Sequence, residues 1–159
     1  MASDQPNDAA AVLAAAKTVP GLLSTTARVL VASLNASACT ISRAIGDLLV
    51  DLVDYSPTGS VQLGHGYLIS DYPATREVLE ELRPNAVSVA DPSADEHEVA
   101  LLRQLGFESL LMLPLAVNGA AWGLVEVYNR DRDRFSQRDL EAASDIVAHA
   151  SAALTRLAG

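Results

Sequence analysis

The chain has 159 residues, 50% of them hydrophobic and 19% charged, which predicts one globular domain with a single core. Its formal net charge of −9 is not offset by any cluster of Lys and Arg, so binding to DNA or RNA phosphates is not expected. The one cysteine, Cys39, excludes a disulfide framework within the chain and a cysteine-rich metal site. No apolar run is long enough to span a membrane, and the N-terminus lacks a basic signal region, so we expect a cytoplasmic protein.

The N-terminal part of the sequence predicts two helices. Residues 1–6 are expected to be disordered, and an Ala-rich helix over 8–18 forms an N-terminal extension that spans 7–19. Pro20 and Gly21 are expected to separate this helix from a second one, which Ser24 caps and which runs to about residue 36. Because so short a helix is marginal alone, the first must pack either on a partner subunit or on its own domain.

The middle of the chain predicts short strands followed by helical segments. Strands over 39–44 and 48–55 are joined by a turn too short for a crossover helix, so they should pair antiparallel. A short strand near 67–69 precedes a helix over 71–82, for which Asp71 is the expected N-cap.

Another strand and another helix follow. Residues 86–90 predict a strand, and Ser93 to Glu96 match a capping box that opens the next helix. That helix is expected to turn Val99, Leu102 and Leu105 inward and to end at Gly106.

The last third of the chain predicts a hairpin and a long helix. Apolar runs over 109–116 and 120–128 flank Asn118-Gly119, the strongest short-range hairpin signal. After a charged loop, Ser136 is the expected N-cap, with Asp139 completing a capping box and Phe135 and Leu140 forming a hydrophobic staple. The element order predicts an α+β fold: a central antiparallel sheet of about six strands, with the N- and C-terminal helices on one face and short helices on the other.

Two runs in this region carry a family resemblance. PLAVNGAAWGLVEVYN (114–129) and FSQRDL (135–140) resemble the closing half of a GAF domain, and the resemblance extends over roughly residues 20–158. GAF domains are sensory and regulatory modules related in fold to PAS domains. The resemblance therefore implies a single GAF domain over residues 7–158, with a ligand pocket between the sheet and the short middle helices.

The second hairpin strand supplies the first candidate binding residues. Alternation along a strand predicts that Trp122, Leu124, Glu126 and Tyr128 share one face. The resemblance implies that this face lines the pocket, which makes Glu126 a candidate polar anchor for a ligand. The alternative is that Glu126 is simply exposed to solvent near an edge of the sheet.

Further candidate residues follow the third strand. Tyr67, Tyr72, Thr75 and Arg76 are polar groups that converge beside the expected cavity, as a small-molecule site requires. Each has an alternative role, and Arg76 in particular could pair with Glu80 one turn later. Asp91 follows a strand and is expected to face the same cavity, unless it only starts the turn before Pro92.

The resemblance implies a non-catalytic sensory domain that binds a small molecule, pairs as a homodimer through its terminal helices, and acts on a fused or separate output domain. It names no ligand or cofactor. The alternative from another class is a ligand-free dimerisation or scaffold module.

Three more specific functions are disfavoured. A free methionine-sulfoxide reductase needs several thiols, and bilin attachment needs a cysteine near the pocket, whereas Cys39 lies on the first predicted strand. The cyclic-nucleotide GAF motif is matched only partly, by Asn129-Arg130, Phe135 and Asp139, and we expect Arg130 to reach Asp139. His65, His97 and His149 lack metal-ligand spacing, so no metal site is predicted.

Overall fold

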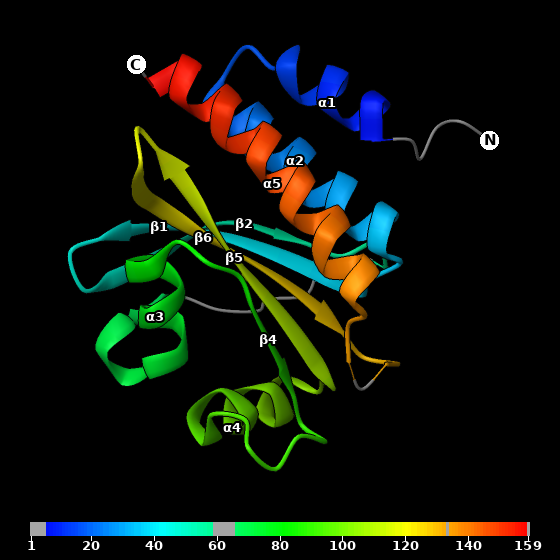
Figure 1. Ribbon diagram of the computed structural model, residues 1–159, viewed down its shortest axis with the longest axis vertical. Coiled ribbons are helices and arrows are strands. Elements are labelled where there is room, and N and C mark those ends of the chain that lie inside the picture. The colour runs from blue at the N-terminus through cyan, green and yellow to red at the C-terminus, as the bar shows by residue number, and fades with distance from the viewer. Residues whose placement is uncertain (1–5, 59–65, 133, 159) are drawn as a thin grey trace.

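The computed structural model describes residues 6–58, 66–132 and 134–158 and has the predicted α+β fold, a curled antiparallel sheet between two layers of helices (Figure 1). Its elements in chain order are α1 (Pro6–Ala14), α2 (Val19–Leu34), β1 (Ala38–Ile45), β2 (Leu48–Tyr55), β3 (Tyr67–Leu68), the 3-10 turn η2 (Ile69–Asp71), α3 (Pro73–Glu81), β4 (Asn85–Ser88), α4 (Glu96–Leu105), β5 (Ser109–Val117), β6 (Ala120–Asn129) and α5 (Gln137–Ala158).

The six strands lie in the order β3-β2-β1-β6-β5-β4, and each neighbouring pair is antiparallel. The predicted β5–β6 hairpin is confirmed: Asn118 and Gly119 have φ angles of 54° and 79°, the left-handed values that the turn requires. The hairpin places β6 beside β1, so β6 lies inside the sheet rather than at an edge.

The two faces of the sheet carry separate apolar clusters. Helices α2 and α5 cover one face, where residues such as Ile41, Leu113 and Val125 are buried. Helices α3 and α4 cover the other, where Leu49, Met112 and Leu124 are buried with them. Figure 1 shows the terminal helices together on one side and α3 and α4 on the opposite side, as predicted.

The start of α2 differs from the prediction. Thr18 is the N-cap, and its hydroxyl accepts a hydrogen bond from the backbone N–H of Gly21 at 3.1 Å. Pro20 lies in the first turn, where a proline removes no intrahelical hydrogen bond, so Pro20 and Gly21 belong to the helix and Ser24 lies inside it.

The N-terminal extension packs on its own domain, the second of the two alternatives. Leu13 of α1 is fully buried in the cluster beneath α2 and α5. The guanidinium of Arg156 in α5 donates hydrogen bonds to the carbonyl oxygens of Ala14, at 3.0 Å, and Ala16, at 3.1 Å. These contacts hold the end of α1 against the end of α5. Of residues 1–6, predicted to be disordered, residues 1–5 lie outside the described chain, and the prediction is wrong for Pro6, which begins α1.

Two helix starts in the middle of the chain were predicted wrongly. Asp71 ends the 3-10 turn η2, and Tyr72 stands at the N-cap of α3 without a capping side chain. Asp95 caps α4 in place of Ser93, because its carboxylate accepts hydrogen bonds from the N–H groups of His97, at 2.8 Å, and Glu98, at 3.3 Å. The C-terminal glycine of α4, Gly106, is as predicted, with φ 84°.

Candidate functional site

Glu126 lies in the middle of β6 and faces the layer formed by α3 and α4. It is 1% exposed, which excludes the solvent-exposed alternative. Its Oε1 atom accepts hydrogen bonds from the hydroxyls of Tyr67, at 2.7 Å, and Thr40, at 3.4 Å, and its Oε2 atom accepts one from Tyr128 at 3.1 Å. Three hydroxyls, from β3, β1 and β6, therefore converge on one buried carboxyl group.

Burial raises the pKa of Glu126 from 4.5 to about 7, because the charged form is poorly solvated there. The negative charge of Glu98 acts in the same direction, while the hydrogen bonds from Tyr67 and Tyr128 favour the charged form and oppose the rise. The carboxyl group therefore changes its charge close to neutral pH.

Glu98 is a second buried acid on this side of the sheet, and the sequence reasoning missed it. It lies in the first turn of α4, is 1% exposed, and accepts a hydrogen bond from the hydroxyl of Thr75 on α3. Burial raises its pKa. The available signal was spacing: Glu98 precedes the buried Leu102 by four residues and so shares its helix face.

Tyr67 on β3 and Tyr72 at the N-cap of α3 lie against each other. Their ring centroids are 5.0 Å apart with planes tilted by 59°. Burial, followed by the charge of Glu126, raises the pKa of Tyr67, so its hydroxyl stays protonated and remains a donor to Glu126. Burial, followed by the charge of Glu98, raises the pKa of Tyr72.

The structure therefore groups part of the predicted set. Tyr67, Thr75 and Glu126 share the buried layer, with Leu124 beside them in the same cluster and Tyr72 half-buried at its border. Arg76 is exposed, and its guanidinium lies 3.7 Å from the carboxylate of Glu80, the alternative considered for it.

Asp91 does not join this group. Its carboxylate is exposed and accepts hydrogen bonds from the N–H, at 2.9 Å, and the hydroxyl, at 2.8 Å, of Ser93, which lower its pKa. This is the geometry of a turn-forming aspartate. Asp91 lines a separate hollow of about 400 Å³ with Arg134 and Phe135.

Trp122 faces the opposite side from the one predicted. Leu115 pairs with Gly123 but Ala116 pairs with Ala121, so Trp122 is an extra residue in β6, a β-bulge. The bulge reverses the alternation, and Trp122 packs against the cluster under α2 and α5. The guanidinium carbon of Arg43 lies 4.6 Å from the centre of its ring.

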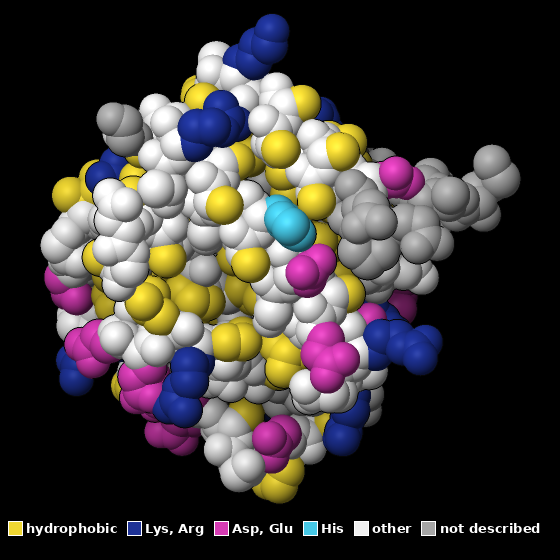
Figure 2. Space-filling view, turned by 45° about the horizontal axis from the view of Figure 1, so that its top comes forward, with side chains coloured by type: hydrophobic (Ala, Val, Ile, Leu, Met, Phe, Trp, Pro, Cys, Tyr) yellow, Lys and Arg dark blue, Asp and Glu magenta, His cyan; other side chains and the backbone are white. Residues whose placement is uncertain are grey.

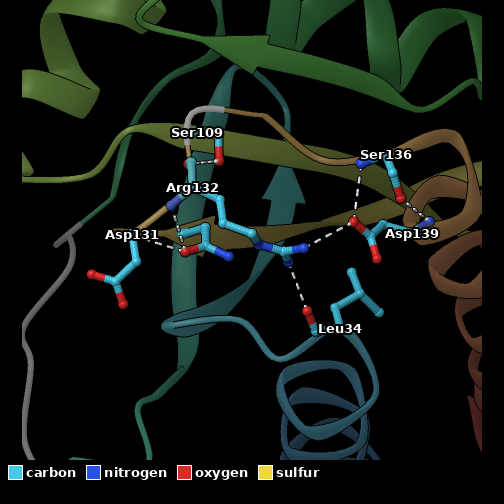
Figure 3. A network of polar contacts seen from close by, with 7 residues as sticks. Leu34, Ser109, Asp131, Arg132, Ser136 and Asp139 are labelled. Atoms are coloured by element: carbon cyan, nitrogen blue, oxygen red, sulfur yellow. Dashed lines mark hydrogen bonds and ion pairs between the residues drawn. The ribbon is translucent and has the colours of Figure 1, made fainter.

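A polar network ties the end of β6 to both terminal helices (Figure 3). The guanidinium of Arg132 donates to the carbonyl oxygen of Leu34 at the end of α2, at 2.8 Å, and lies 3.4 Å from the carboxylate of Asp139 in α5. The backbone oxygen of Arg132 accepts a hydrogen bond from Ser109 at 2.8 Å. Ser136 and Asp139 form the predicted capping box, at 3.0 and 3.1 Å.

The predicted link from Arg130 to Asp139 is therefore wrong. Arg130 instead stacks over Phe107, with its guanidinium carbon 4.9 Å from the ring centre. Arg132 makes the link instead. It lies in a turn held by the Asn129 side chain, which accepts hydrogen bonds from the N–H groups of Asp131, at 3.0 Å, and Arg132, at 3.2 Å.

Cys39 is buried on the other face of the sheet from Glu126, beneath the terminal helices. Burial is the main cause that raises the pKa of its thiol, and the charges of Glu126 and Asp54 raise it further, so the reactive thiolate is disfavoured.

The described ranges 6–58, 66–132 and 134–158 hold no group of three or more His, Cys, Asp or Glu side chains placed to bind a metal. No helix in those same ranges is long and apolar enough to cross a membrane. His65 lies outside the described residues.

The surface also carries an apolar hollow of about 280 Å³ between α5 and β5, lined by residues such as Leu113, Pro114 and Val147. Figure 2 shows hydrophobic side chains gathered in a hollow on one face of the molecule, with acidic and basic side chains around it. Neither this hollow nor the one beside Asp91 is lined by Glu126 or Glu98.

Comparisons with known proteins agree on the fold. The family model described as the GAF domain matches residues 19–154. A phycocyanobilin-bound GAF domain from a cyanobacterial phytochrome superposes with a TM-score of 0.81 at 21% identity, covering 96% of this chain and 95% of that one. A phycoerythrobilin-bound GAF domain from a cyanobacterial phytochrome gives a TM-score of 0.82 at 18% identity, with the same coverage.

The chromophore-binding domain of an unusual bacteriophytochrome from R. palustris gives a TM-score of 0.84 at 12% identity. The match covers 96% of this chain but only 61% of that longer chain. At these identities the likeness concerns the fold. No curated protein matches the sequence.

Proposed function

This chain belongs to the GAF domain family, and from that premise we propose that it is a non-catalytic sensory domain that binds a small molecule between the sheet and helices α3 and α4. Residues 7–158 form the domain, with α1 as an N-terminal extension. GAF domains are generally sensory rather than catalytic, and the buried, protonated thiol of Cys39 is unsuited to a thiol-based reaction.

The observation that carries the proposal is the pair of buried acids, Glu126 and Glu98. Each side chain lies in the layer under α3 and α4 and is 1% exposed. A buried carboxyl group lowers stability unless it is well paired, and such groups gather at functional sites more often than in ordinary cores. Tyr67, Tyr72 and Thr75 supply the hydroxyl groups and rings that a small-molecule site uses for orientation.

The signalling part of the proposal follows the path of β6. The strand that holds Glu126 continues into Arg132, which contacts the end of α2 and the start of α5. A ligand that shifts β6 would therefore act on both terminal helices. We propose that these helices pair in a cytoplasmic homodimer and pass the change to a fused or separate output domain.

A ligand-free scaffold is the second candidate, and one observation favours it. Both carboxylate oxygens of Glu126 already accept hydrogen bonds from side chains of this chain, Tyr67, Thr40 and Tyr128. An interior satisfied in this way needs no ligand to complete its hydrogen bonds.

A comparison of fresh and refolded protein tests the proposal. A ligand carried through purification at about one hundred times its Kd stabilises the folded state by about 2.7 kcal/mol. Protein unfolded in denaturant, dialysed and refolded loses that ligand, so we expect a Tm about 5 to 10 °C lower by calorimetry. Adding back the small-molecule fraction of a boiled sample of fresh protein should restore the Tm.

The control is the same cycle applied to Glu126→Gln, for which fresh and refolded samples should differ less. Identical Tm values for fresh and refolded wild-type protein, with no effect of the added fraction, would favour the scaffold.

A further inference from the structure

Among the residues that the structure describes, no buried base is paired with the buried acids of the proposed site. Arg43 stacks on Trp122 on the opposite face, and Arg76 is exposed and paired with Glu80. His97, whose charge acts weakly on Glu98, is largely exposed and lies 3.5 Å from Asp95. Within the described chain, hydroxyl groups alone donate side-chain hydrogen bonds to Glu126 and Glu98.

A third acid adds an unsatisfied acceptor to this layer. Asp51 on β2 lies opposite Ser42, which in turn lies opposite Leu124 of the same buried face. Its Oδ1 atom accepts a hydrogen bond from Ser42 at 2.9 Å. Its Oδ2 atom is enclosed and accepts no hydrogen bond from the described residues, and its charge raises the pKa of Glu126.

This arrangement has a definite electrostatic preference. An anion placed beside Glu126, Glu98 and Asp51 would meet three acidic groups in a poorly solvated layer, where repulsion from those that are ionised is screened little. A cation with N–H donors would supply a countercharge to these acids and a donor for the Oδ2 atom of Asp51. The rings of Tyr67 and Tyr72 lie 5.0 Å apart at the border of the layer, and aromatic rings also attract a cation.

We infer that the ligand of this domain is a small organic cation, one that presents a protonated amine, amidine or guanidine group to Glu126 with Glu98 behind it. This inference rests on the proposed function, because it concerns the same site. It makes Glu98 and Glu126 specificity-determining residues that reject phosphates and carboxylates, and so argues against a cyclic nucleotide.

The site also exchanges a proton for the ligand. Near neutral pH part of the Glu126 population carries a proton. A bound cation favours the carboxylate, so the proton leaves to the buffer when the cation binds. Binding should therefore tighten as the pH rises from 6 to 8.

Three probes that share one ring but differ in charge test the inference on the full chain. Benzamidine is a cation, benzamide is neutral and benzoate is an anion at pH 7.5. In titrations followed by ¹H–¹⁵N NMR, we expect benzamidine to shift the amides of Tyr67, Glu98 and Glu126, and benzoate to shift none of them. Isothermal calorimetry in phosphate and Tris buffers should show proton release with benzamidine.

Matched variants identify the groups responsible. Glu126→Gln and, separately, Glu98→Gln should weaken benzamidine binding by about tenfold or more, as expected for loss of a charge-assisted hydrogen bond. Glu80→Gln, an exposed acid on α3, should leave it unchanged. Two buried positions are substituted separately because either variant could fail to fold. The amide spectrum of each variant shows directly whether it has folded.

The inference is overturned if benzoate binds as tightly as benzamidine, if none of the probes binds, or if both buried-site variants bind benzamidine like the wild type. An anionic ligand released from the purified protein would overturn it while leaving the proposed function intact. Absence of any released ligand together with absence of probe binding would remove both.

Discussion

The free energy of unfolding of the wild-type chain is expected to fall as the pH rises from 4.5 to 7, and Glu126→Gln is expected to remove much of that fall. The pKa of Glu126 is about 7 in the folded chain and 4.5 as the ordinary value. Between these pH values the folded state binds the proton and the unfolded state has released it, so stability is lost as pH rises. At about 1.4 kcal/mol per pH unit, the loss from this group is about 3 kcal/mol.

The fall distinguishes this carboxyl from an ordinary salt-bridged one, whose lowered pKa adds stability below pH 4.5 and leaves it constant from pH 4.5 to 7. Urea unfolding at pH 5, 6, 7 and 8 measures the effect as the difference between wild type and variant. Glu98, whose pKa is also raised, adds a slope of the same sign and remains in the variant. Glu80→Gln, at an exposed acid, should keep the wild-type slope. Parallel profiles for wild type and Glu126→Gln would contradict this account of the buried acid.

Gly123→Ala is expected to destabilise the fold by about 3 kcal/mol or more, a large effect for one methyl group. Gly123 lies on β6 opposite Arg43 of β1, next to the bulge at Trp122. A Cβ atom at this position would lie 2.2 Å from the carbonyl oxygen of Ser42, which is backbone and cannot turn aside. To make room for the Cβ atom, β6 and β1 must separate near Ser42, whose hydroxyl donates a hydrogen bond to Asp51.

Gly119→Ala in the hairpin turn is the matched control. A Cβ atom at Gly119 would meet no other atom within 4 Å, so only the left-handed backbone, with φ 79°, disfavours the substitution. The expected loss there is about 1 kcal/mol. Chemical unfolding of both variants gives the comparison, and equal losses would mean that the strands at Gly123 separate at little cost.

The fold could be predicted because its signals are local. Asn118-Gly119 specifies the hairpin through its backbone conformation, and Ser136 with Asp139 starts α5 through hydrogen bonds three residues apart. The turn after β1 is too short for the crossover connection that parallel strands need, so β1 and β2 pair antiparallel. These features need no knowledge of distant contacts.

The site was predicted only in part, because it depends on contacts between distant residues. Tyr67 and Glu126 are 59 residues apart and meet only once β3 joins the sheet. Glu98 looks like one of the acids of a polar first helical turn, and its burial follows from where α4 packs. Trp122 was misplaced because strict alternation cannot reveal a bulge, which is visible only in the pairing with β5.

Native mass spectrometry of freshly purified protein, set against the mass under denaturing conditions, tests the central claim most directly. We expect an adduct of small-molecule mass that is lost on denaturation, because Cys39 lies on the far face and is unsuited to covalent attachment. We expect the adduct to be reduced in Glu126→Gln, and the same spectrum gives the number of subunits. A chain of bare mass in both spectra, with no adduct in any charge state, would contradict the claim that this domain holds a small molecule and would leave the scaffold as its function.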